Sequence, residues 1–291
     1  WDYFEIMAEI KIQKLAGVMG WPIRHSLSPE LHSFWLSKYE INGFYVPLAV
    51  SQKNLEAALR SLPKLGFGGT NLTAPLKEEA MRIVDHLDPV AERIGAINTV
   101  FVNKDGYLSG TNTDAIGFME NLKDRAPKWE PSKSPVVVLG AGGAARAVVA
   151  ALVDVGVPEI RLINRTLSRA HEVHLSIGGP VSVYGWAEVN ECLSGASLVV
   201  NTTTLGMDGQ PPMQINLAGL SSDAVVTDIV YTPLMTPFLN HANTLGLKCV
   251  DGLGMLLHQA ALGFKGWFGQ KPEVTDELRT HVLTKITERS G

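Results

Sequence analysis

A glycine-rich turn near the middle of the chain has the residues of a dinucleotide-binding site. Residues 140–147 read G-A-G-G-A-A-R-A; they follow an apolar, β-branched run at 135–139 and overlap an Ala/Val-rich stretch at 144–153. The first run predicts a buried parallel strand and the second a helix. Glycines in such a turn let a pyrophosphate approach the backbone, and the helix N-terminus offers it free N–H groups. The pattern predicts cofactor contacts from the turn, namely Gly140, Ala141, Gly142, Gly143 and Ala144.

The residues after the next predicted strand indicate which dinucleotide is bound. That strand, at 159–163, is followed by Asn164, Arg165 and Thr166, and Arg169 comes shortly afterwards. NAD-binding proteins place an acidic residue here to bind the ribose 2′-hydroxyl, and this chain has none. A guanidinium pairs with a 2′-phosphate, which a carboxylate would repel. A lone arginine at a strand end is usually only a surface residue, but its place in a complete fingerprint favours NADP(H) as the cofactor.

Composition excludes several classes of protein. The chain has 291 residues, 45% of them apolar, with a formal net charge of −4. Basic residues are not in excess over acidic ones, so the composition does not favour nucleic-acid binding. Cys192 and Cys249 follow no metal spacing and are interpreted as reduced thiols, so we expect a cytoplasmic protein without a metal site. No segment resembles a membrane span, residues 1–6 do not form a secretory signal, and Met7 is compatible with a native start.

The remaining sequence predicts the elements that position these groups. Strands are expected at 15–19, 43–50 and 68–72, with helices at 29–39 and 54–65 between them. After a charged connection at 123–134, further strands are expected at 197–201, 224–230 and 248–250, and an apolar helix at 254–268. We therefore expect an α/β fold of two domains with a cleft between them. Residues 1–115 and 253–291 would form the substrate domain, and residues 116–252 a Rossmann-type NADP-binding domain.

Polar side chains follow several strands of the first predicted domain. Ser26 and Ser28 stand ahead of a helix, where serines either cap the helix or hold a small carboxylate, and the sequence does not decide between these roles. Asn71, Thr73 and Lys77 follow the strand at 68–72, and the carboxyl ends of parallel strands face the ligand crevice. A lone lysine is more often a solvated surface residue. Two more polar segments, at 96–100 and 110–114, are each common turn sequences and carry little weight alone.

The order of all these segments resembles the shikimate dehydrogenase family. Its motifs are G-W-P-I-x-H-S-x-S-P from residue 20, N-x-T-x-P-x-K from 71, A-I-N-T-V from 96, G-x-N-T-D from 110, the glycine run, and N-R-T from 164. Further matches are N-T-T-T-L-G-M from 201, D-I-V-Y-T-P from 228 and D-G-L-G-M-L-L-H-Q-A from 251. The resemblance begins near residue 15 and covers nearly all of the chain after it. Departures from the family pattern, at Ser33, Leu72, Ala74, Thr202 and Thr204, remove no catalytic group.

This resemblance implies reversible reduction of 3-dehydroshikimate to shikimate by NADPH, in chorismate and aromatic amino-acid biosynthesis. By position, Lys77 and Asp114 are implied as the catalytic pair. The implied substrate contacts are Ser26, Ser28 and Tyr231 for the carboxylate, and Asn71, Thr73, Asn98 and Gln259 for the ring hydroxyls. The implied cofactor contacts, besides the glycine run, are Asn164, Arg165, Thr166, Arg169, Thr203, Met207, Gly252 and Met255.

Two questions stay open at this level. Lys77 would act either as the proton donor to the substrate oxygen or mainly as an electrostatic clamp, since burial lowers the pKa of an amine and a nearby carboxylate raises it. The oligomeric state, monomer or homodimer, cannot be read from the residues. The alternatives are a quinate/shikimate dehydrogenase using NAD, which Arg165 argues against, and a non-catalytic nucleotide-sensing module. Glutamyl-tRNA reductase is disfavoured because no cysteine precedes Cys192.

Overall fold

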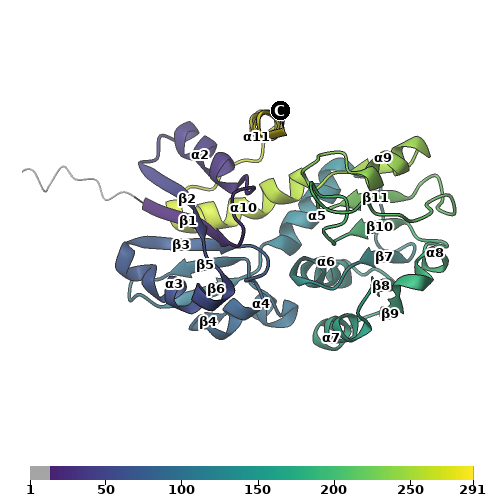
Figure 1. Cartoon of the computed structure of the whole chain (residues 1–291), viewed down its shortest axis with the longest axis horizontal. Helices are drawn as coiled ribbons and strands as arrows, with labels where there is room; N and C mark the ends of the chain where they lie inside the picture. The colour runs from purple at the N-terminus through teal and green to yellow at the C-terminus, as the bar shows by residue number, and fades with distance from the viewer. Residues whose placement is uncertain (1–13, 291) are drawn as a thin grey trace, which may run out of the picture.

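Two six-stranded sheets, each flanked by helices, form two lobes of the computed structural model (Figure 1). The structure describes residues 14–290, so the expectations for residues 1–6 and Met7 lie outside the described part. The α/β class and the presence of two sheets are as predicted. In the described part of the chain, no helix combines the length and the apolar character needed to cross a membrane.

The first sheet has the order β2-β1-β3-β5-β6-β4. Strands β1, β2 and β3 run parallel, whereas β5 is antiparallel to both β3 and β6. The carboxyl ends of β1, β3 and β6 and the amino end of β5 therefore meet at one edge. The strands are β1 (Lys14–Gly20), β2 (Gly43–Ala49), β3 (Phe67–Leu72), β4 (His86–Leu87), β5 (Thr99–Val102) and β6 (Leu108–Thr111).

Of the three helices predicted for the first lobe, those at 29–39 and 254–268 are present with nearly the predicted bounds. The helix expected at 54–65 is divided into η1 (Gln52–Asn54), α3 (Leu55–Ser61) and η2 (Pro63–Leu65). Pro63 explains the interruption, because a proline inside a helix removes a hydrogen bond and clashes with the preceding turn. The other helices of this lobe are α2 (Ser28–Lys38), α4 (Pro89–Ile94), α10 (Leu253–Phe268) and α11 (Asp276–Ser290), with the short η3 (Glu79–Arg82).

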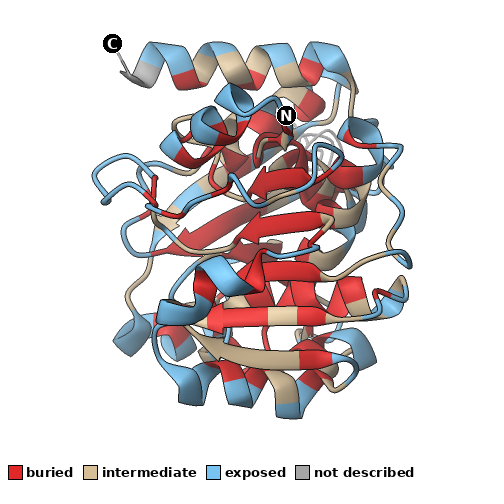
Figure 2. Ribbon diagram, turned by 90° about the vertical axis from the view of Figure 1, so that its right-hand side faces the viewer, coloured by how far each residue is buried: buried red, intermediate tan, exposed pale blue. Residues whose placement is uncertain are grey.

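The second sheet is entirely parallel, with the order β12-β11-β10-β7-β8-β9. Its strands are β7 (Val136–Leu139), β8 (Ile160–Asn164), β9 (Val181–Gly185), β10 (Leu198–Asn201), β11 (Val225–Asp228) and β12 (Lys248–Val250). The helices around it are α6 (Gly143–Asp154), α7 (Leu167–Ile177), α8 (Val189–Cys192) and α9 (Pro237–Thr244), with the short η4 (Trp186–Glu188). The central strands are buried on both faces, as Figure 2 shows in red. The strand order reverses between β7 and β10, which is where ligands bind in doubly wound sheets.

Helices α5 (Asp114–Arg125) and α10 carry the chain from one lobe to the other and pack against each other (Figure 1). Two glycines let them approach closely. A Cβ on Gly117 would lie 2.7 Å from the backbone oxygen of Met255, and a Cβ on Gly254 would overlap the side chain of Asn121. Asn121 in turn donates a hydrogen bond from Nδ2 to the backbone oxygen of Asp251 at 2.7 Å. The first residue of α5 thereby takes a defined position relative to α10.

Candidate active site

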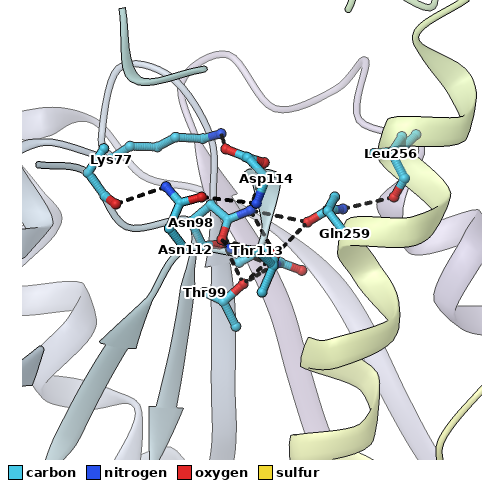
Figure 3. A network of polar contacts seen from close by, with 10 residues as sticks. Lys77, Asn98, Thr99, Asn112, Thr113, Asp114, Leu256 and Gln259 are labelled. Atoms are coloured by element: carbon cyan, nitrogen blue, oxygen red, sulfur yellow. Dashed lines mark hydrogen bonds and ion pairs between the residues drawn. The ribbon is translucent and has the colours of Figure 1, made fainter. Parts of the chain in front are cut away.

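Lys77 and Asp114 form an ion pair at the edge of the first sheet where β3 and β6 end (Figure 3). Lys77 follows β3 by five residues, and Asp114 is the first residue of α5. The Nζ of Lys77 lies 2.5 Å from Oδ2 of Asp114, and the two side chains are only 16% and 7% exposed. A lysine held this way by a buried carboxylate is not free in solvent. The interpretation of Lys77 as a solvated surface residue is therefore wrong.

Asn98, the residue before β5, holds the other oxygen of the carboxylate (Figure 3). Its Nδ2 donates to Oδ1 of Asp114 at 2.8 Å and to Oε1 of Gln259 at 3.3 Å, while its Oδ1 accepts from the backbone N–H of Thr113 at 2.8 Å. The backbone N–H of Asp114 also donates to Oδ1 of Asn112 at 3.0 Å. Both carboxylate oxygens and the backbone of Asp114 are therefore held by neighbouring side chains, which leaves its position well defined.

Tyr45 connects two of the predicted substrate-binding residues, and the sequence reasoning missed it. Its hydroxyl donates to Oδ1 of Asn71 at 2.6 Å and also hydrogen-bonds Ser28. Burial raises the pKa of Tyr45 well above its usual value, so the hydroxyl stays protonated. Asn71 donates both amide hydrogens to protein, to the backbone oxygen of Asn98 at 3.1 Å and to Oγ1 of Thr99 at 3.0 Å. A tyrosine within a strand usually only packs, and no local signal distinguished this one.

The other residues predicted for the substrate lie at the same edge or pack beside it. Oγ of Ser26 accepts from the backbone N–H of Ser28 at 3.3 Å, which is a capping-type contact, although Leu27 is the N-cap residue of α2. The backbone N–H of Thr73 donates to the backbone oxygen of Met19 at 3.0 Å, so the segment after β3 stays beside β1. Tyr231 packs against the apolar cluster between α2 and α10.

The glycine turn brings the second lobe up to Lys77. Gly140 has φ +109°, and a Cβ there would lie 2.7 Å from Oγ1 of Thr202, so this position requires glycine. A Cβ on Gly142 would meet open space, whereas one on Gly143 would lie 3.5 Å from Cδ of Lys77. Ala145 is completely buried where α6 packs on the sheet. The turn thus has the open backbone that a pyrophosphate needs, and it lies beside the aliphatic part of the Lys77 side chain.

The residues predicted for the 2′-phosphate gather at the exposed end of β8 and the start of α7. Asn164 donates from Nδ2 to the backbone oxygen of Thr166 at 2.8 Å, which tightens the turn. Arg165 is exposed, and Nη2 of Arg169 lies 3.4 Å from Oε1 of Glu78. The first turn of α6 carries no acidic residue, so nothing there opposes an anion. Exposed guanidinium groups and an open helix N-terminus fit a phosphorylated dinucleotide.

Four further predicted cofactor residues lie after β10 and β12: Thr203 and Met207 in the loop after β10, Gly252 at the N-cap of α10 and Met255 in the first turn of α10. Thr203 donates from Oγ1 to Oδ1 of Asn201 at 2.7 Å and lies against Gly140. Met207 is 38% exposed, whereas Met255 is buried and Gly252 packs against the backbone of Ile229. Within the described chain, no hydrogen bond or ion pair links Thr203, Met207, Gly252 or Met255 to Lys77 or Asp114.

No group of three or more His, Cys, Asp or Glu side chains in residues 14–290 is arranged to hold a metal ion. The polar groups around Lys77 are instead one ion pair surrounded by amides and hydroxyls (Figure 3). Such a site can donate and accept hydrogen bonds and transfer a proton at Nζ.

Comparison with known proteins gives one consistent result. Family models match residues 18–100 (shikimate dehydrogenase substrate binding domain), 122–206 (shikimate / quinate 5-dehydrogenase) and 252–276 (shikimate 5′-dehydrogenase C-terminal domain). Shikimate dehydrogenase (NADP(+)) of Paramagnetospirillum magneticum is 58% identical over 93% of this chain and 98% of its own length.

Two solved structures share the fold over 94% of this chain and 99% of theirs. Shikimate 5-dehydrogenase from Thermus thermophilus, in complex with NADP(H) and shikimate, has 37% identity and a TM-score of 0.83. Quinate dehydrogenase from Corynebacterium glutamicum, in complex with NAD, has 29% identity and a TM-score of 0.85. Overall shape therefore does not separate the two activities, and the side chains must decide between them.

Proposed function

Because the chain belongs to the shikimate dehydrogenase family, we propose that it catalyses the reversible NADPH-dependent reduction of 3-dehydroshikimate to shikimate. This reaction places the protein in the pathway to chorismate and the aromatic amino acids, in the cytoplasm. The observation that carries the proposal is the partly buried ion pair of Lys77 and Asp114, with the Lys77 side chain beside the glycine turn at Gly143.

NADPH, when bound, supplies the hydride that reduces the carbonyl carbon. Gly140, Gly142 and Gly143 would hold the pyrophosphate, and the exposed guanidinium groups of Arg165 and Arg169 would hold the 2′-phosphate. The remaining residues assigned to the cofactor are Ala141, Ala144, Asn164, Thr166, Thr203, Met207, Gly252 and Met255.

Lys77 stabilises the substrate oxygen as negative charge develops on it. Its ammonium donates a hydrogen bond to that oxygen and then delivers the proton that completes the alcohol. Asp114 holds the ammonium in place, and Asn98 holds Asp114 through the hydrogen bond to Oδ1. In the oxidative direction the same groups act in reverse, with Lys77 receiving the proton from the substrate hydroxyl.

Substrate recognition is assigned to neutral donors and acceptors, all of them on the first lobe except Tyr231, which follows β11 in the second lobe. Ser26, Ser28 and Tyr231 would bind the carboxylate, and Asn71, Thr73, Asn98 and Gln259 would bind the ring hydroxyls. Since both amide hydrogens of Asn71 are donated to protein, the group that it offers to a hydroxyl is its carbonyl oxygen. We assign residues 1–115 and 253–291 to substrate binding and residues 116–252 to cofactor binding.

One alternative has a specific observation in its favour. The fold matches the NAD-bound quinate dehydrogenase as well as it matches the NADP-bound relative. Arg165 and Arg169, with no carboxylate directly after β8, favour NADP over NAD in this chain. Initial rates with shikimate and quinate, each with NADP⁺ and NAD⁺, decide between the two: shikimate with NADP⁺ is expected to be the best pair.

The role of Lys77 is tested by Lys77→Ala, with Lys104→Ala as a matched control at an exposed position. Loss of general acid–base catalysis typically costs about 10²–10⁴-fold in rate, and we expect kcat for shikimate oxidation to fall by this amount. Dissociation constants for shikimate and NADP⁺ should change little, and Lys104→Ala should match the parent protein. Near-normal kcat in purified Lys77→Ala would refute the proposed role.

A further inference from the structure

Glu78, the neighbour of Lys77, contacts the other lobe at the predicted phosphate site. Its Oε1 lies 3.4 Å from Nη2 of Arg169, which stands in the first turn of α7. The two side chains are about half exposed, at 42% and 53%. Adjacent residues thus have separate partners: Lys77 pairs with Asp114 within its own lobe, and Glu78 pairs with a cofactor-site arginine across the lobes.

A second ion pair joins the lobes away from the predicted cofactor site, and it provides a comparison. Nη2 of Arg93 in α4 lies 2.5 Å from Oδ2 of Asp154 at the end of α6. The backbone oxygen of Arg93 also accepts a hydrogen bond from Oγ of Ser176 in α7 at 3.1 Å. Both pairs connect the same two lobes through exposed or partly exposed side chains. Only the pair of Glu78 and Arg169 includes an arginine assigned to the 2′-phosphate.

We propose that Glu78 determines how strongly this protein prefers NADP(H) over NAD(H), by competing with the 2′-phosphate for Arg169. The proposal rests on the assignment of Arg165 and Arg169 to that phosphate in the proposed function. Where a 2′-phosphate pairs with Arg169, the Glu78 carboxylate either gives up the guanidinium or shares it with a second anion. NAD(H) has a neutral ribose hydroxyl at that place and meets no such competition.

The electrostatics give the direction and the size of the effect. A phosphate monoester carries close to two negative charges at neutral pH, and the carboxylate of Glu78 has the same sign. The carboxylate and the phosphate, several ångströms apart and exposed to solvent, repel each other weakly. We expect this repulsion to change the binding constant of a 2′-phosphorylated nucleotide by about fivefold. By thermodynamic reciprocity, binding of the 2′-phosphate weakens the contact of Glu78 with Arg169 to the same extent. Glu78 therefore lowers the affinity for NADP(H) and leaves the affinity for NAD(H) unchanged.

The test uses two nucleotide fragments that need no catalysis: 2′,5′-ADP, which carries the phosphate in question, and 5′-AMP, which lacks it. Their dissociation constants are measured by calorimetry at low ionic strength on the whole protein and on Glu78→Gln. We expect Glu78→Gln to bind 2′,5′-ADP about fivefold more tightly and 5′-AMP equally well. Asp154→Asn, which removes the comparison ion pair, should change neither constant.

Three results would overturn the proposal: unchanged or weaker binding of 2′,5′-ADP by Glu78→Gln, an equal gain for both fragments, or the same gain in Asp154→Asn. Equal affinity of the parent protein for the two fragments would also overturn it, because the arginines would then not bind the phosphate. Absence of shikimate oxidation by the parent protein, with normal discrimination between the fragments, would instead contradict only the proposed catalysis.

Discussion

Asp228, at the carboxyl end of β11, is a buried carboxylate whose charge should destabilise the fold at neutral pH. The side chain is fully buried, and burial raises its pKa from 3.8 to about 6. Three hydrogen bonds offset this only in part: Oδ1 accepts from Nδ2 of Asn201 at 2.9 Å and from the backbone N–H of Val230 at 3.0 Å, and Oδ2 accepts from Oγ1 of Thr236 at 2.7 Å.

The raised pKa sets the pH window of the effect. Below about pH 3, Asp228 is protonated in both the folded and the unfolded chain, and this contribution to stability is fully present. As the pH rises from about 4 through about 6, the unfolded chain releases the proton first, so the free energy of unfolding falls. The rise in pKa from 3.8 to about 6 corresponds to a total loss of about 3 kcal/mol by pH 8.

Asp228→Asn removes the charge and can keep the hydrogen bonds. The amide oxygen can accept from Asn201 and Val230, and the amide nitrogen can donate to the Thr236 hydroxyl after that hydroxyl rotates. We expect the free energy of unfolding of Asp228→Asn, relative to the parent protein, to increase by about 2.5 kcal/mol between pH 4 and pH 8. Urea titrations followed by tryptophan fluorescence and circular dichroism at each pH measure this difference.

Asp85 supplies a control of opposite sign. A backbone hydrogen bond from Leu108, followed by a hydrogen bond from Arg60, lowers the pKa of Asp85 below its usual value. Its ionised form therefore contributes stability above about pH 4 that is lost as the pH falls, so Asp85→Asn should lose stability relative to the parent as the pH rises. A difference between Asp228→Asn and the parent protein that stays flat from pH 4 to pH 8 would refute the reasoning about burial.

Two further predictions concern the cofactor and the packing of the lobes. Arg165→Ala should lower kcat/KM for NADP⁺ by about 10- to 100-fold, since hydrogen bonds to charged groups are worth about 1.5–3 kcal/mol, and should leave kcat/KM for NAD⁺ within about threefold. An equal loss with both cofactors would contradict the 2′-phosphate assignment. Gly117→Ala should lower the free energy of unfolding by about 1–3 kcal/mol, because its Cβ would meet Met255 and Gln259 where α5 packs on α10. It should also raise KM for shikimate, and a variant as stable as the parent in urea would contradict the packing argument.

Local signals in the sequence were sufficient for much of the fold. The strand, turn and helix around Gly140 appear as predicted, because a turn that requires positive φ next to an apolar run is determined by neighbouring residues. The apolar helix predicted at 254–268 is α10, Leu253–Phe268. The helix predicted at 54–65 is wrong in its extent, because Pro63 cannot continue the α-helix and α3 ends at Ser61.

Contacts between distant segments could not be predicted in the same way. Asn98 lies 16 residues from Asp114 and 161 from Gln259, and it reaches both because β5 runs antiparallel and begins at the edge where β3 and β6 end. A purely parallel sheet, as the sequence predicts, would not bring Asn98 to this edge, and only the family resemblance points to this residue. Tyr45 was indicated neither by a local sequence pattern nor by a family motif. Its contact with Asn71 depends on the pairing of β1 with both β2 and β3.

The contact between Glu78 and Arg169 could not be predicted from the sequence for the same reason. Glu78 and Arg169 are 91 residues apart, and each is an ordinary exposed charge in its own segment. Their meeting depends on how α7 approaches the segment after β3, which no periodicity or motif encodes. Exposed ion pairs contribute little to the stability of a fold. The effect of this pair is therefore expected on the binding of another charged group that competes for the same arginine. In the proposed cofactor site the competitor is the phosphate that distinguishes the two nicotinamide cofactors, and the Glu78 carboxylate would weaken the preference for NADP(H) that the arginines would give.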